Sequence, residues 1–316
     1  MILPCPRAER HGRISPAMVP QAWVVNHGVL VHDHAAHTLQ MIRLLAIDID
    51  GTLLDSRGRL PAENLEAIEA VVARGVHVAL ATGRSYPFAR PVAEPLPASV
   101  TLIVSNGAVE RSMDGGTLAR RLLPRAVARN VLVRTRIYRH LAALIFDRDD
   151  SRQMLYESMD WEHPARKGYW LQNKALIERC VPLLEGLDED PIQVMFNGPV
   201  LLIRELAETM AAAAEGYALS LTEYEQRNFS LLDVTAVDTT KGRALAARAR
   251  RMGLGRDEVM AIGDNLNDMD MLAFAGHPVV MGNAVAALKD RGWTLTGAQD
   301  KAGVAQAIHR LILGVT

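Results

Sequence analysis

This chain of 316 residues has few cysteines, almost no net charge and no long apolar run. The two cysteines, Cys5 and Cys180, do not form a C-x-x-C spacing, which argues against a disulfide framework and against a cysteine zinc site. The formal net charge of -1 gives no overall field to attract nucleic acid or an anionic membrane surface, so any bound anion must be held by local groups. No apolar run approaches the roughly 20 residues that a transmembrane helix needs.

What is present is the composition of an ordinary globular protein. Hydrophobic residues make up 49% of the chain and charged residues 22%. A chain of this length can bury a sizeable core, and it has room for one large domain or two medium ones.

The first 40 residues differ from the rest, because they mix proline, histidine and arginine with short apolar patches and show no sustained periodicity. They also lack the apolar core of a signal peptide. We expect residues 1–40 to be a disordered extension, or the product of a start codon placed too early, with the compact fold beginning at about Met41. His32, His34 and His37 suggest a metal site, but no predicted scaffold would hold them.

After this segment, short apolar runs alternate with stretches of helical periodicity. Leu65, Ile68 and Val72 recur at helical spacing, and Gly75 follows as a helix-ending residue. A last helix is expected over residues 304–313. The runs expected to form strands are residues 42–47, 76–80, 101–104, 258–262 and 278–281. The sequence therefore predicts an α/β fold, with a Rossmann-like parallel sheet and helices on both faces.

The pattern changes between residues 124 and 232. Expected strands at 142–146, 192–196 and 217–221 are mixed with helices, and most of the aromatic residues of the chain fall here. This predicts a second, smaller α+β domain over residues 124–232. It would be inserted into a first domain made of residues 41–123 and 233–316.

Polar or acidic residues follow four of the predicted strands. Ligands of open parallel α/β sheets bind at the carboxyl ends of the strands. Each of the four segments includes a glycine, which lets the backbone approach a ligand closely. Such residues are also common in ordinary turns, but four of these segments on one edge favour a binding site. The segments are Asp48–Thr52, Thr82–Arg84, Ser105–Gly107 and Gly263–Asp268.

Four aspartates are expected at this edge: Asp48, Asp50, Asp264 and Asp268. Clustered carboxylates repel one another and raise each other's pKa unless a cation lies among them. Since only oxygen ligands are available, the cluster favours a hard divalent ion such as Mg²⁺ over zinc.

Four motifs, in order, resemble those of the haloacid dehalogenase superfamily of phosphatases. They are DIDGT at 48–52, ATGR at 81–84, Lys241 within TTKGRAL, and GDNLND at 263–268. The segments SNGA at 105–108 and MGNA at 281–284, together with the insertion, look like the Cof-type branch with a class IIB cap. The resemblance extends from Ile42 to the C-terminus, and the 40-residue extension departs from the family pattern.

The resemblance implies a role for each matched residue. Asp48 would be the nucleophile that forms an aspartyl-phosphate, and Asp50 the general acid and then the general base. Asp264 would bind Mg²⁺ beside the Asp48 carboxylate and the Asp50 backbone carbonyl, with Asp268 as a further ligand or support. The candidates for phosphate or substrate contact are Thr82, Gly83, Arg84, Asn106, Lys241 and Asn267.

Lys241 is expected to open a helix with Leu245, Ala249 and Met252 on one face. A lysine at this end works against the helix dipole. An anionic partner would explain it, and a solvated surface lysine is the alternative. In the first case the lysine would neutralise the phosphate and the charge of Asp48.

The partner implied is a small phosphorylated metabolite, such as a sugar phosphate, with no nucleic acid and no membrane involved. We expect a cytoplasmic enzyme acting as a monomer or homodimer. A phosphomutase of the same superfamily and a non-catalytic sensor of phosphorylated ligands are the alternatives. Within the insertion, residues 163–170 (HPARKGYW) combine cationic and aromatic side chains and are nominated as a specificity loop, with a packed surface turn as the alternative.

Overall fold

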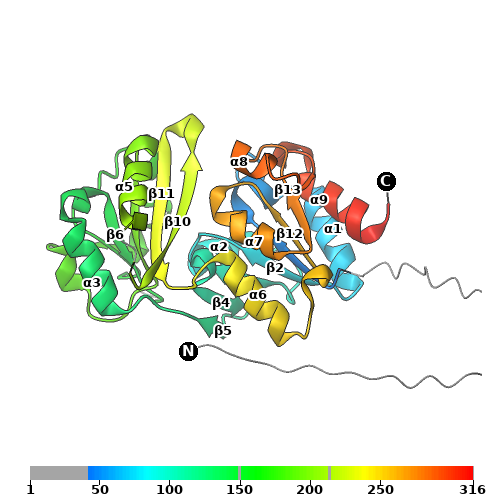
Figure 1. Cartoon of the computed structure of the whole chain (residues 1–316), viewed down its shortest axis with the longest axis horizontal. Coiled ribbons are helices and arrows are strands. Elements are labelled where there is room, and N and C mark those ends of the chain that lie inside the picture. Colours follow the sequence, from blue (N-terminus) through cyan, green and yellow to red (C-terminus); the bar gives the residue numbers. More distant parts are fainter. Residues whose placement is uncertain (1–41, 149–150, 213–214, 316) are drawn as a thin grey trace, which may run out of the picture. The chain divides into compact units, whose positions relative to one another are not determined.

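The computed structural model describes residues 42–148, 151–212 and 215–315, which form two β-sheets with their helices (Figure 1). The disordered extension expected over residues 1–40 lies outside the described residues, as do His32, His34 and His37 within it. The strands are β1 (Leu44–Ile47), β2 (His77–Ala81), β3 (Thr101–Val104), β4 (Val109–Ser112), β5 (Thr117–Arg120), β6 (Ala142–Ile145), β7 (Met154–Tyr156), β8 (Ile177–Arg179), β9 (Gln193–Gly198), β10 (Tyr217–Tyr224), β11 (Phe229–Ala236), β12 (Val259–Gly263), β13 (His277–Val280) and β14 (Thr294–Leu295). The helices are α1 (Ala62–Ala73), α2 (Tyr86–Ala93), α3 (Arg125–Arg134), α4 (Pro164–Asn173), α5 (Val200–Ala212), α6 (Lys241–Arg251), α7 (Met269–Phe274), α8 (Ala286–Lys289) and α9 (Gly303–Ile308).

The first sheet has the order β14-β13-β12-β1-β2-β3-β4-β5. Its strands from β14 to β3 are parallel, and β4 and β5 add an antiparallel edge. All four residues of β1 are buried, as expected for a central parallel strand that is covered on both faces. Burial of Leu44, Leu45 and Ile47 contributes about 1.5–3 kcal/mol each to stability. The predicted α/β fold with a central parallel sheet is confirmed.

The helix predicted from Leu65, Ile68 and Val72 is α1, which packs against α9. Gly75 follows its end with a φ of +82°, in the left-handed region that favours glycine. On the same sheet, α6 contacts α7. The last helix was predicted to reach residue 313. It is a regular α-helix, α9, as far as Ile308, and it continues as a wider helical turn over His309–Leu313.

The second sheet has the order β10-β11-β9-β6-β7-β8 and is antiparallel except for the β7–β8 pair. All of its strands come from the chain between β5 and α6. The predicted strands at 142–146, 192–196 and 217–221 correspond to β6, β9 and β10. The boundary predicted between residues 232 and 233 falls inside β11, so the last strand of this sheet runs four residues past it, to Ala236. The division into a core and an inserted cap stays our proposal for the organisation of the chain.

Two short connections join the segment that carries the second sheet to the rest of the chain, namely residues 121–124 and 237–240. They lie side by side, because Nη1 of Arg121 donates a hydrogen bond to the carbonyl oxygen of Val237 at 3.4 Å. A further contact between the two sheets is the ion pair of Arg111 and Asp147, with 2.6 Å between Nη2 and Oδ1.

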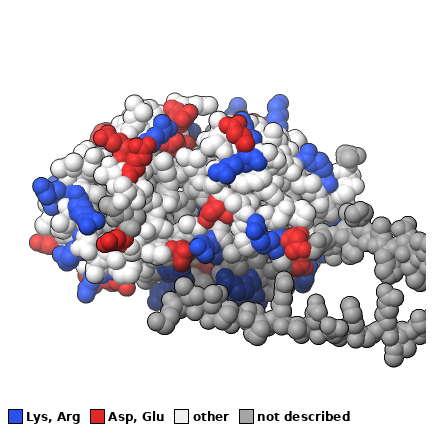
Figure 2. All heavy atoms as spheres, viewed as in Figure 1, with Lys and Arg blue, Asp and Glu red and all other residues white. Residues whose placement is uncertain are grey.

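The surface carries charges of both signs. Figure 2 shows lysine and arginine side chains interspersed with aspartate and glutamate over the visible face. This agrees with the net charge of -1 and leaves the binding of anions to local groups. Among the helices in the described part of the chain, none is long and apolar enough to cross a membrane.

Candidate active site

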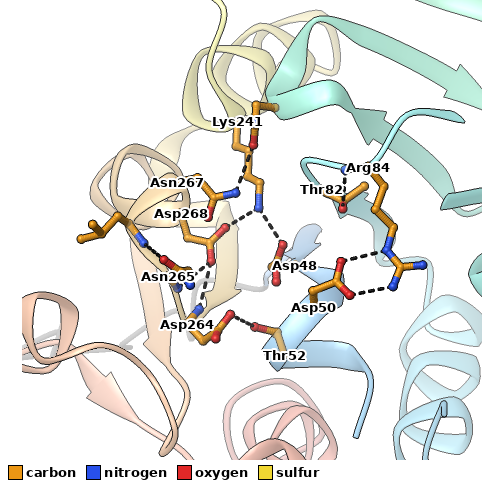
Figure 3. A network of polar contacts seen from close by, with 12 residues as sticks. Asp48, Asp50, Thr52, Thr82, Arg84, Lys241, Asp264, Asn265, Asn267 and Asp268 are labelled. Carbon is orange, nitrogen blue, oxygen red and sulfur yellow. Dashed lines mark hydrogen bonds and ion pairs between the residues drawn. The ribbon is translucent and has the colours of Figure 1, made fainter. Parts of the chain in front are cut away.

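The carboxyl ends of β1, β2, β3 and β12 bring the predicted site residues to one edge of the first sheet (Figure 3). Parallel pairing aligns these ends, since Ile47 lies opposite both Leu80 and Ile262. In Figure 3, Asp48, Lys241 and Asp268 point toward one another, while Asp50 faces Arg84. The predicted site residues that meet here are Asp48, Asp50, Thr82, Gly83, Arg84, Asn106, Lys241, Asp264, Asn267 and Asp268.

Lys241 is the first residue of α6 and is fully buried. Its ammonium donates to Oδ1 of Asp48 and to Oδ1 of Asp268, at 2.6 Å in both cases. Burial alone would lower the pKa of Lys241, but Asp268 and Asp48 outweigh it and raise the pKa above its ordinary value. The lysine that opposes the helix dipole therefore has anionic partners within the protein, and the alternative of a solvated surface lysine is wrong.

Three carboxylates lie close enough to hold a metal ion. One oxygen each from Asp48, Asp264 and Asp268 lies within 4.8 Å of the others. Burial and the charge of Asp268 raise the pKa of Asp48 to about 7, and burial and Asp48 raise the pKa of Asp264 to about 9. A divalent cation would favour the ionised forms of all three. Because all of the donors are carboxylate oxygens, the residues fit a hard ion such as Mg²⁺.

The sequence of the first motif is explained by the contact between Gly51 and Asp264. Gly51 has a φ of +88°, and a Cβ atom at this position would collide with the Asp264 carboxylate. Next to it, the hydroxyl of Thr52 donates to Oδ1 of Asp264 at 3.1 Å. The glycine and the threonine of DIDGT therefore position a carboxylate that lies more than 200 residues away in sequence.

Asp50 lies apart from the three carboxylates. Its two oxygens accept hydrogen bonds from Arg84, at 2.8 Å from Nε and 2.6 Å from Nη2. A bidentate guanidinium fixes the orientation of a carboxyl group. Arg84 was predicted to contact substrate or phosphate, and here it holds the second aspartate of the motif.

Thr82 and Gly83 follow β2 and line the same cavity as the aspartates. The Thr82 hydroxyl accepts a hydrogen bond from the backbone N–H of Arg84 at 3.1 Å. A Cβ atom at Gly83 would lie 3.3 Å from Oδ1 of Asn106, so the glycine permits a close approach of two neighbouring strand ends.

Asn106 links the two sheets, and its amide group is occupied by protein partners. Its Nδ2 donates to Oδ2 of Asp233 at 2.6 Å, and its Oδ1 accepts from Nδ2 of Asn267 at 3.1 Å. The other oxygen of Asp233 accepts from Gln193 at 2.7 Å. Burial raises the pKa of Asp233 to about 7, against the opposing hydrogen bond from Asn106. Asn106 and Asn267, predicted to contact the ligand, thus also connect the two sheets.

Two residues at the site were not among the sequence predictions. Asp233 is the single charged residue of its strand, FSLLDVTA, and that isolated charge was a usable signal. Asn265 lies inside the GDNLND motif, where its Nδ2 donates to the backbone oxygen of Glu223 on β10 at 3.0 Å. No pattern in the sequence identifies this contact, because it depends on how the two sheets meet.

A cavity of about 1300 Å³ extends from Asp48 and Asp50 to the second sheet and α4. Residues 163–170 were nominated as a specificity loop. The prediction of a loop is wrong, because most of this segment forms α4. Arg166 and Tyr169 line the cavity, as do His163, Pro164, Ala165 and Gly168 of the same segment. Lys167 is exposed and pairs with Glu162, and Trp170 stacks on Trp161.

Comparison with known proteins links this site to a family. The family described as haloacid dehalogenase-like hydrolase matches residues 45–308. The HMP-PP phosphatase of Serratia proteamaculans (strain 568) is 34% identical over 256 residues, which cover 79% of this chain and 87% of the relative.

Solved structures are similar in fold. A haloacid dehalogenase-like hydrolase from B. subtilis has a TM-score of 0.73 at 24% identity, covering 85% of this chain and 99% of the other. The HAD subclass IIB sugar phosphatase BT4131 has a TM-score of 0.68 at 21% identity, covering 87% of this chain and 100% of the other.

Proposed function

Because the chain belongs to the haloacid dehalogenase-like hydrolases and is a phosphatase of that superfamily, as its motifs predicted, we propose that it hydrolyses small phosphorylated metabolites with Mg²⁺ through an aspartyl-phosphate on Asp48. The observation that carries this proposal is the position of Asp48, which lines the large cavity and has a buried ammonium on one oxygen. Phosphoryl transfer needs positioning and charge neutralisation more than covalent activation, and this arrangement supplies both.

Asp48 is the proposed nucleophile. Lys241 binds Oδ1, and within the described part of the chain Oδ2 has no hydrogen-bond partner. That second oxygen would attack phosphorus while the bond from phosphorus to the leaving oxygen breaks, which leaves a phosphorylated Asp48. Lys241 lowers the cost of bringing a phosphate dianion beside a carboxylate, because its charge lies between Asp48 and Asp268.

Asp50 is the proposed acid and base. In the first step its proton would pass to the leaving alcohol oxygen. In the second it would take a proton from the water that attacks phosphorus, while the bond from phosphorus to the Asp48 oxygen breaks and inorganic phosphate and the free Asp48 carboxylate are released. The contact with Arg84 supports this role, because it orients both oxygens of Asp50. For the acidic role, we infer that the leaving oxygen meets a protonated Asp50 whose contact with Arg84 has loosened.

Asp48 and Asp264 would hold Mg²⁺, with the Asp50 backbone carbonyl as the further ligand that the family resemblance implies. When bound, the ion supplies positive charge that orients the phosphate and offsets the charge building up on its oxygens. Asp268 is expected to support the site, because its Oδ2 already accepts from the backbone N–H groups of Asp264 and Asn265 and its Oδ1 accepts from Lys241.

The proposed substrate class is a small phosphorylated metabolite. Relatives are named for such compounds, including HMP-PP phosphatase and the 5-amino-6-(5-phospho-D-ribitylamino)uracil phosphatase YcsE of Bacillus subtilis. The cavity is larger than a phosphate group requires, so the remaining space would hold the leaving group between the two sheets.

The test is release of inorganic phosphate from p-nitrophenyl phosphate and from sugar phosphates, with Mg²⁺ or with an excess of chelator. We expect turnover with Mg²⁺ and none after complete chelation. Asp48→Asn should abolish turnover because it removes the attacking charge, while Asp290→Asn, at an exposed position, serves as the control. Activity that survives chelation would contradict the role of the metal. Isomerised sugar phosphate without free phosphate would indicate a mutase, and no turnover of any ester would indicate a sensor.

A further inference from the structure

Arg166 is a buried cation without an anionic partner. It is 7% exposed, and its guanidinium donates to Oδ1 of Asn197, to the Asn197 backbone oxygen at 2.8 Å and to the Asp160 backbone oxygen at 3.4 Å. No carboxylate within the described ranges lies at ion-pair distance from it. Burial lowers the pKa of Arg166, against the opposing charge of Asp160, and a buried charge whose hydrogen-bond partners are all neutral is costly.

This cation lies where a ligand can reach it. Arg166 lines the cavity that also contains Asp48 and Asp50. Three of its five N–H groups have partners, and two remain available as donors. It occupies the first turn of α4, which begins at Pro164. The positive end of the helix dipole makes this position unfavourable for a cation and favourable for an anion.

Two further donors lie on the cavity wall. Trp161 has a buried indole N–H without an acceptor in the described part of the chain, and Arg227, which is exposed, forms no ion pair with a described residue. Asp160 is the carboxylate whose charge acts on Arg166, and it forms no ion pair with it among the described residues. The carboxylate of Asp233 also lines the cavity. Its two oxygens are held by Asn106 and Gln193, and it forms no ion pair with Arg166.

The other cations near the reaction centre are already engaged. Lys241 lies between Asp48 and Asp268, and Arg84 is bound to both oxygens of Asp50. Arg166 belongs instead to α4 and is anchored on Asn197 of β9, on the side of the cavity formed by the second sheet. It is therefore placed to bind a part of the substrate other than the phosphate that is removed.

We propose that Arg166 binds a second anionic group on the substrate, so that the preferred leaving group carries a carboxylate or a further phosphate. This inference rests on the proposed hydrolase function and names the substrate class of the same site. Arginine suits the task, because its planar fork binds carboxylates and phosphates in a bidentate manner and stays charged when buried.

The experiment compares matched substrates in the presence of Mg²⁺. One pair is 6-phosphogluconate and sorbitol 6-phosphate, which differ in a carboxylate at the far end. The other is fructose 1,6-bisphosphate and fructose 6-phosphate, which differ in a second phosphate. We expect kcat/KM to be about 10- to 100-fold higher for the charged member of at least one pair, as hydrogen bonds to a charged group would give. The pair that shows the preference identifies the second anion.

Arg166→Met should reduce that preference to near unity, mainly through a higher KM for the charged member, and Arg166→Lys should restore part of it. The ratio within one variant does not depend on how much of that variant is folded. The control is Arg129→Met, which changes an exposed arginine on α3 and should leave the ratio unchanged.

Two results would overturn the inference alone. The wild type could hydrolyse both members of each pair equally, or Arg166→Met could lower kcat/KM equally for both members. In the second case Arg166 would act on the reacting phosphate or on folding. The proposed hydrolase function would survive either result, because p-nitrophenyl phosphate would still be hydrolysed. Failure to hydrolyse any ester, p-nitrophenyl phosphate included, would remove the hydrolase function and the inference together.

Discussion

At the scale of single residues, the two aspartates of DIDGT have different surroundings and should respond differently to the same substitution. Asp50→Asn removes proton transfer but leaves Asp48 and Lys241 in place. General acid–base catalysis contributes about 10²–10⁴-fold, so a residual rate should be measurable. We expect the loss to be smaller for p-nitrophenyl phosphate than for an alkyl phosphate, since nitrophenolate leaves without a proton.

The measurement is kcat/KM for both esters in the wild type and in Asp50→Asn. Arg84→Met is the companion variant, since it leaves Asp50 intact but removes the guanidinium that binds both of its oxygens. Equal losses for good and poor leaving groups in Asp50→Asn would show that Asp50 does not transfer the proton.

Asp233 should make stability depend on pH. Burial raises its pKa from 3.8 to about 7, so the folded protein keeps this proton to a higher pH than the unfolded chain does. The neutral form of Asp233 therefore adds to the free energy of unfolding. This contribution is fully present below about pH 4 and is lost as pH rises through about 7. The loss is at most on the order of 4 kcal/mol.

Asp233→Asn cannot ionise, so its free energy of unfolding should fall less than that of the wild type across this interval. Urea unfolding at a series of pH values and fixed ionic strength measures the difference. Asp290→Asn is the control, since its side chain is exposed. Parallel curves for the wild type and Asp233→Asn would mean that Asp233 is ionised throughout.

Residues of the site differ in how far sequence predicts them. Asp48, Thr82 and Asp264 follow predicted strands directly, so the parallel order of the sheet is enough to bring them together. Asp233 and Gln193 come from two strands of the second sheet, and their contact depends on the pairing of Asp233 with Met195. A shift of one residue in that pairing would turn Asp233 to the other face, and the sequence does not determine the register.

At the scale of elements, the N-terminus of α6 determines where Lys241 lies. Thr240 precedes Lys241, and its hydroxyl accepts a hydrogen bond from the backbone N–H of Arg243 at 3.2 Å. Thr240→Ala should lower the free energy of unfolding by about 0.5–2 kcal/mol, as expected for the loss of an N-cap. Activity should fall as well, because the first turn holds Lys241 against Asp48.

Urea unfolding and phosphate release from p-nitrophenyl phosphate measure the two effects. Thr240→Ser keeps the hydroxyl and should remain close to the wild type in both. If alanine and serine at this position behave alike, the cap does not stabilise the helix.

Elements with a regular pattern were predicted well, and short ones were not. The strand predicted at 101–104 is β3 with the same bounds, because a threonine and three apolar residues are flanked by clear turn signals. β7 and β8 have three residues each, which is too short for any period to show. Residues 163–170 were nominated as a loop for their cationic and aromatic side chains, but most of them form α4, although Gly168 lies in its middle and glycine disfavours a helix interior by about 1 kcal/mol.

At the scale of the whole molecule, Mg²⁺ should stabilise the fold through the three clustered carboxylates. A ligand that binds only the folded state adds about 2.7 kcal/mol at a concentration 100 times its Kd. Asp264→Asn removes one ligand, so the rise in Tm on adding Mg²⁺ should be smaller. Without metal this variant should be at least as stable as the wild type, because burial and Asp48 disfavour the ionised form of Asp264 and raise its pKa to about 9.

Thermal unfolding with chelator and with Mg²⁺ gives both values. Asp290→Asn, an exposed position away from the cluster, should gain as much from Mg²⁺ as the wild type. An equal gain in Asp264→Asn would place the ion elsewhere.

The contact between Arg121 and Val237 has a consequence for how this protein can change over generations. The chain leaves the first sheet and returns to it at neighbouring points, joined by one hydrogen bond. If a gene rearrangement replaced residues 122–236, its two junctions with the rest of the chain would therefore already lie side by side. The replacement would also need partners for the contacts between the two sheets, such as that of Asn106 with Asp233. With the roles proposed above for Asp48 and Arg166, chemistry and recognition could then be inherited separately, and new substrates could be acquired by exchanging one continuous piece of sequence.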